Sequence, residues 1–184
     1  GARQAGRAAE SARALTAPID GPGAARGCRH RNGRDRRRGR GGLACACGVA
    51  RYANGARDLR HTITHLQAID ETDIPRFPRL GVIASMSLQW ARRDAYSVNS
   101  TLGYIDDAVY QRLYPAAELW RAGAIVAGGS DYPIDPLKPM VQIETAVDHT
   151  GEAIPGVFPG ALSPNEAIDD LLAVVKMHTI NAAY

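Results

Sequence analysis

The stretch Ala124-Ile125-Val126-Ala127-Gly128-Gly129-Ser130-Asp131-Tyr132-Pro133 decides the fold of this chain. A short apolar run ends in two glycines and is followed by a serine and an aspartate, and Pro133 lacks the N–H that would continue a strand. Buried parallel strands end in this way at the sheet edge where ligands bind. The sequence therefore predicts a strand over residues 124–129, with Asp131 presented at its carboxyl end.

A second strand, predicted over residues 60–67, brings a histidine to its end. In His61-Thr62-Ile63-Thr64-His65-Leu66-Gln67 alternate residues are polar, and His65 arrives as the strand finishes. A histidine and an aspartate at the ends of neighbouring parallel strands favour a metal-activated water and its proton acceptor. The alternative is that His65 is an ordinary polar strand residue and Asp131 caps a turn. Spacing alone leaves both interpretations open.

Helical patterns separate the strands, and a third strand is predicted over residues 82–87. Thr72 is the expected cap of a short helix that ends at Gly81, and a polar loop is expected over residues 89–105. Later helices are expected from Asp106 to Gly123 with a break at Pro115, over residues 139–147, and over residues 166–177 after the capping box of residues 163–166. The last of these should bury Ile168, Leu171, Leu172 and Val175.

This order of elements predicts an α/β fold with parallel strands. The loops that follow the strands are long and polar, which favours part of a (β/α)8 TIM barrel over an open doubly wound sheet. Three strands cannot close a barrel alone.

Charge divides the chain of 184 residues into two parts. Residues 1–57 hold 13 Arg and 3 acidic residues, a balance of +10, whereas residues 58–184 hold 9 Lys and Arg and 16 acidic residues, a balance of −7. No aromatic residue precedes Tyr52. We therefore predict a basic, low-complexity and poorly structured segment over residues 1–53, and a folded part over residues 54–184.

Localisation follows from what the sequence lacks. It contains no apolar run that could span a bilayer and no export signal, and its three cysteines form no disulfide framework. These features predict a cytoplasmic protein without a membrane partner.

The basic segment has alternative interpretations. Cys28, His30, Cys45 and Cys47 are potential zinc ligands, although their spacing differs from the usual pairs. The arginines of residues 34–42 could contact nucleic-acid phosphates, but no aromatic residues accompany them. A solvated tail is the favoured interpretation, and a nucleic-acid partner is the less favoured one.

Several segments occur together in an order that resembles one known family. They are Arg60-His61-Thr62-Ile63-Thr64-His65, Leu80-Gly81-Val82-Ile83-Ala84-Ser85-Met86, Leu113-Tyr114-Pro115, the stretch from Ala122 to Pro133, and Thr179-Ile180-Asn181-Ala182-Ala183-Tyr184. The chain from about Asn54 onward resembles the C-terminal part of amidohydrolase family 3, the YtcJ-like group that includes N-substituted formamide deformylase.

The resemblance implies fold, chemistry and site. It implies strands six to eight of a metal-dependent barrel, with zinc as the metal and small amide-type, non-peptide C–N compounds as substrates. His65 then matches the strand-six metal ligand, and Asp131 matches the strand-eight catalytic aspartate, which also contacts the metal. Thr64 stands where the family usually has Glu, and residues 87–89 replace its Gln-Pro.

The family's remaining ligands and its other strands have no counterpart in this sequence. Residues 1 to about 50 therefore suggest a frame-shifted or chimeric translation, which the coding DNA would test. A hydrolase fragment that is inactive alone and self-associates through exposed barrel edges is the main expectation. An inactive remnant and a nucleic-acid-binding segment on an α/β scaffold are the alternatives.

Overall fold

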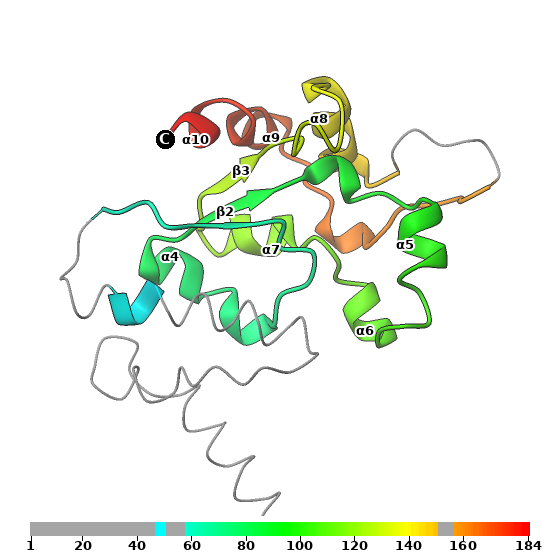
Figure 1. Ribbon diagram of the computed structural model, residues 1–184, viewed down its shortest axis with the longest axis horizontal. Helices are drawn as coiled ribbons and strands as arrows, with labels where there is room; N and C mark the ends of the chain where they lie inside the picture. Colours follow the sequence, from blue (N-terminus) through cyan, green and yellow to red (C-terminus); the bar gives the residue numbers. More distant parts are fainter. Residues whose placement is uncertain (1–46, 51–57, 151–156) are drawn as a thin grey trace, which may run out of the picture.

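The computed structural model describes residues 47–50, 58–150 and 157–184. Within them a three-stranded parallel sheet, in the order β1-β2-β3, runs through the centre of the molecule (Figure 1). The strands are β1 at Thr62–Thr64, β2 at Ile83–Met86 and β3 at Val126–Gly128. All three strands predicted from the sequence are therefore present, each shorter than predicted.

Helices connect the strands, as the alternating pattern predicts. The first connection contains η1 (Glu71–Asp73) and α4 (Arg76–Leu80). The second contains η2 (Leu88–Trp90), α5 (Ala95–Asn99), α6 (Asp107–Tyr110) and α7 (Ala116–Arg121). After β3 come α8 (Pro139–Asp148), η3 (Pro164–Glu166), α9 (Leu171–Met177) and α10 (Ile180–Ala183). None of the described helices is long and apolar enough to cross a bilayer.

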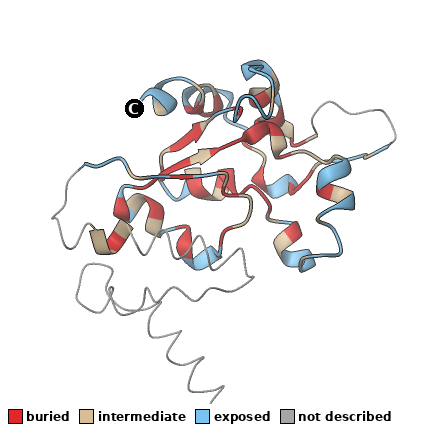
Figure 2. Ribbon diagram, viewed as in Figure 1, coloured by how far each residue is buried: buried red, intermediate tan, exposed pale blue. Residues whose placement is uncertain are grey.

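Most residues of β2 and β3 are buried (Figure 2), and one face of the sheet forms the core. The register aligns Ile63, Ala84 and Val126 across the sheet, and all three are buried in one apolar cluster with side chains of α4 and α7. The opposite face carries Thr62 and Thr64, which are exposed, and the half-buried Ser85. Because successive strand residues point to opposite faces, one face forms the core, whereas the other carries these polar residues together with the buried Ile83 and Ala127.

Helix caps account for most differences from the sequence-based expectations. Asp70, rather than Thr72, caps η1, since its carboxylate accepts from the Thr72 backbone N at 3.0 Å. The expected capping box at residues 163–166 is wrong: the Ser163 hydroxyl instead donates to the Tyr110 carbonyl at 3.0 Å. Ser163 has φ 46°, outside the extended region that an N-cap residue needs.

Helix α9 consequently begins five residues later than expected, capped by Asp170. This shift changes the face that it buries. Leu171 and Leu172 are exposed, contrary to expectation, whereas Ala173, Val174 and Met177 are buried. Ile168 precedes the helix and is fully buried, as expected.

Two further expectations are corrected. The loop over residues 89–105 is not entirely irregular, because a capping box between Asp94 and Ser97 starts α5 there. The sequence pattern also favours core positions for all three methionines; Met86 and Met177 are buried, but Met140 is exposed. The expectations for residues 1–46, including those for Cys28, His30 and Cys45, lie outside the described residues.

Candidate functional site

The site is built by the loops that follow the three strands. Because the strands are parallel, these loops leave the sheet at the same edge, with β2 between the other two. His65 directly follows β1 and has φ 68°, and Asp131 lies three residues beyond β3 with φ 56°. Positive φ angles are uncommon for residues other than glycine and gather at functional sites. The structure therefore places both predicted residues at the same end of the sheet.

The imidazole of His65 is held by stacking rather than by hydrogen bonds. Its ring lies on the indole of Trp90, with 5.6 Å between ring centroids and 14° between the planes. Its Nδ1 atom is buried and has no hydrogen-bond partner among the described residues. This nitrogen is therefore not committed to a hydrogen bond within the described residues.

The loop after β2 holds the loop after β3. The Gln89 side-chain amide donates to the backbone carbonyl of Ser130 at 2.8 Å, and both residues are buried. The indole N–H of Trp90 donates to the carboxylate of Asp135. The chain around Asp131 is therefore fixed on both sides, while Asp131 itself remains exposed to solvent.

The described residues complete no metal site by themselves. Among residues 47–50, 58–150 and 157–184 no group of three His, Cys, Asp or Glu side chains could hold a metal ion. A catalytic zinc normally has three protein ligands and an open position. His65 has an unpartnered ring nitrogen and Asp131 has an exposed carboxylate, so further ligands of a complete site would have to come from outside these residues.

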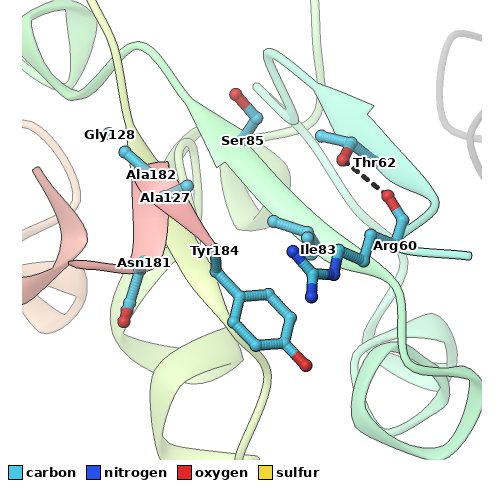
Figure 3. A pocket seen from close by; sticks show the side chains of 9 residues that line it. All are labelled: Arg60, Thr62, Ile83, Ser85, Ala127, Gly128, Asn181, Ala182 and Tyr184. Atoms are coloured by element: carbon cyan, nitrogen blue, oxygen red, sulfur yellow. Dashed lines mark hydrogen bonds between the residues drawn. The ribbon is translucent and has the colours of Figure 1, made fainter. Parts of the chain in front are cut away.

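A pocket of about 250 Å³ lies on the sheet face that carries Thr62 and Ser85, and it is not lined by His65 or Asp131 (Figure 3). Arg60, Thr62 and Ser85 line it together with Tyr184 of the C-terminal segment. The guanidinium carbon of Arg60 lies 4.3 Å from the Tyr184 ring centroid, and its Nε is 3.3 Å from Asp58. The guanidinium of Arg60 is already paired with Asp58 and lies over Tyr184. This pocket therefore does not resemble the predicted metal site.

Residues of the site that the sequence did not single out are Gln89 and Asp135. Trp90, in the same loop as Gln89, packs against His65. Among the other aromatic residues of the same region, Tyr110 is buried, whereas Tyr96 and Tyr104 are exposed. No sequence signal marks Asp135, since its partner Trp90 lies 45 residues away.

Two other histidines have packing roles. His149 ends α8, is fully buried and has its Nδ1 2.6 Å from the Leu162 carbonyl. His178 follows α9, and its Nδ1 lies 3.0 Å from the Val174 carbonyl. Burial lowers the pKa of both imidazoles, which favours their neutral form.

A buried carboxyl cluster joins η3 to α7 away from these loops. A carboxylate oxygen of Glu166, which is buried, accepts from the Glu118 backbone N at 3.1 Å. Arg112 pairs with the Glu118 carboxylate and also with Glu71, at 2.8 Å. Burial, together with the charge and hydrogen bond of the Glu118 carboxyl, raises the pKa of Glu166 to about 7. The hydrogen bond from Arg112 lowers the pKa of Glu118.

Comparison with known proteins places the chain in a class. The model of the amidohydrolase family matches residues 44–184. This match spans most of the sequence, and the chain therefore belongs to the amidohydrolase family.

Two relatives can be named. LONG AFTER FAR-RED 3 of Arabidopsis thaliana is 34% identical over 131 residues, which cover 71% of this chain and 21% of that protein. A solved structure of an uncharacterized metal-dependent hydrolase from Pyrococcus horikoshii OT3 has a similar fold, with a TM-score of 0.55 and 16% identity. That likeness covers 78% of this chain and 27% of the solved one. The chain thus spans about a fifth to a quarter of the length of these relatives.

Proposed function

We propose that this chain is the C-terminal part of an amidohydrolase barrel, with β1, β2 and β3 as strands six, seven and eight. Membership of the amidohydrolase family and the parallel sheet support this proposal. The resemblance to the YtcJ-like group further suggests small amide-type, non-peptide C–N compounds as substrates. The observation that carries the proposal is that the loops bearing His65 and Asp131 leave the same edge of the sheet and are joined through η2.

In this proposal His65 is a metal ligand, and Asp131 is the catalytic carboxylate and a second metal contact. A bound divalent metal, zinc by analogy with the family, would lower the pKa of a bound water to about 7. The imidazole of His65 offers an unpartnered nitrogen, and the exposed carboxylate of Asp131 can accept a proton. The small-molecule substrate would approach from the loop side of the sheet, where both groups lie.

The proposal also includes self-association. Within the described residues β1 and β3 each pair with a strand on one side only, and unpaired strand edges favour association with another chain. Nucleic-acid binding by the basic segment is one alternative, and it rests on residues outside those described. An inactive remnant is the other, and it rests on the absence of activity.

We expect the isolated chain not to hydrolyse amides at an enzymatic rate. The reason is that the described residues supply one imidazole ligand and one carboxylate, whereas a catalytic site needs more ligands held in fixed geometry. The measurement is turnover of N-formyl and N-acyl amines by purified protein with added zinc, beside the variants His65→Ala and Asp131→Ala.

The outcomes of this assay have different meanings. Zinc-dependent turnover that both variants abolish would show that the chain is more complete than proposed and that the two residues are assigned correctly. Turnover that persists in both variants would contradict the site assignment.

A further inference from the structure

We propose that Trp90 is a positioning residue for His65 and that Asp135, through Trp90, makes the orientation of the His65 imidazole depend on the loop after β3. The inference rests on the proposed role of His65 as a ligand. It concerns how this chain fixes the ring, which neither the family match nor the relatives address.

The first support is the way in which His65 is held. A metal-binding histidine is usually oriented by a hydrogen bond from its second ring nitrogen to a carboxylate or carbonyl. Here no described residue forms a hydrogen bond with the His65 ring, and its Nδ1 is buried without a partner. The nearly parallel stack on Trp90, at 14° and 5.6 Å, is the contact that fixes the plane of the imidazole.

The second support is that Trp90 is itself fixed from the opposite loop. Its indole N–H donates to the Asp135 carboxylate, and the neighbouring Gln89 donates to the Ser130 carbonyl at 2.8 Å. Helix α8, which begins shortly after Asp135, packs against η2. The stack therefore couples the loop after β1 to the loop after β3, which carries Asp131.

The experiment uses the full chain and observes the ring protons of His65 by NMR, with and without zinc. In the wild type the indole should shield these protons. We expect Trp90→Ala to remove the shielding and to weaken zinc binding at His65 about 10- to 100-fold, the usual cost of losing an orienting partner. Trp90→Phe retains an aromatic face but lacks the N–H that donates to Asp135, so it should reduce both only in part, as Asp135→Ala does. Asp135→Ala should reduce both, whereas Asp169→Ala, at an exposed aspartate outside these loops, should change neither.

Two results would overturn the inference. One is that His65 ring shifts are the same in the wild type, Trp90→Ala and Asp135→Ala. The other is that these variants lower only the melting temperature and leave the zinc affinity unchanged, which would indicate a purely structural role. If zinc leaves the wild-type His65 signals untouched, the proposed ligand role fails, and the ring shifts alone still decide whether Trp90 and Asp135 orient His65.

Discussion

Replacing Gly128 with alanine is expected to destabilise the fold strongly. A Cβ atom at this position would lie 2.3 Å from Nε2 of His178 and 2.6 Å from two ring carbons, well inside van der Waals contact. The imidazole cannot easily move away, because it is partly buried and its Nδ1 contacts the Val174 carbonyl. Overpacking of this kind typically costs about 1–3 kcal/mol in the free energy of unfolding, and occasionally more.

Gly129 provides the matched control. A Cβ added there has no atom within 4 Å, so Gly129→Ala should leave the melting temperature nearly unchanged. The double variant Gly128→Ala, His178→Ala should recover part of the loss, since it removes the clashing ring. Thermal unfolding followed by circular dichroism compares the three. Equal melting temperatures for Gly128→Ala and Gly129→Ala would show that the His178 ring does not lie against Gly128.

The second large effect concerns pH and the buried carboxyl of Glu166. Its raised pKa, about 7, means that the folded chain binds more protons than the unfolded chain between pH 4.5 and 7. The contribution of Glu166 to stability is therefore greatest below pH 4.5, declines as the pH rises through this window, and remains low above it. Glutamine is a neutral analogue of the protonated side chain and still offers an oxygen to the Glu118 backbone N.

We expect Glu166→Gln to stabilise the protein at pH 8 by at most about 3–4 kcal/mol, at about 1.4 kcal/mol per pKa unit, and to have little effect at pH 4.5. Urea unfolding at the two pH values measures this difference. Glu144→Gln, at an exposed residue of α8, is the control and should show no such pH dependence. A variant that is destabilised more at pH 8 than at pH 4.5 would show that the ionised form of Glu166 is the one that the fold accommodates.

The sheet was predictable from the sequence because its strands carry strong local signals. Apolar runs such as residues 124–129 end in glycine and proline, and the helix after β1 ends at Gly81, whose φ of 64° suits glycine. These features depend on residues close together in the chain. They specify the parallel strands and the edge at which His65 and Asp131 lie.

The contacts that the sequence could not predict are long-range. The Ser163 hydroxyl bonds to Tyr110, 53 residues away, and this competes with the local capping box that the pattern indicated. Glu166 bonds to Glu118 across 48 residues instead of capping its own helix. Hydrogen bonding to distant backbone groups overrode local preference in both cases, and the buried face of α9 changed as a result.

In the candidate site, too, the local features could be predicted from the sequence and the long-range contacts could not. Strand ends marked His65 and Asp131, but the side chains that organise the loops, Gln89, Trp90 and Asp135, became evident only from their contacts. Each of these contacts joins residues from different strand–loop units. A single sequence contains no periodic signal for such pairs.

The assignment of His65 and Asp131 is tested most directly by calorimetric titration of zinc into the purified chain. Replacing Cys28, Cys45 and Cys47 with serine in all samples removes the competing thiolates. We predict a weak zinc site whose binding is lost in His65→Ala and strongly reduced in Asp131→Ala, and which is retained in the controls His61→Ala and Asp169→Ala. Zinc affinity that is the same in all four variants would contradict the proposal that these two residues form part of an amidohydrolase metal centre.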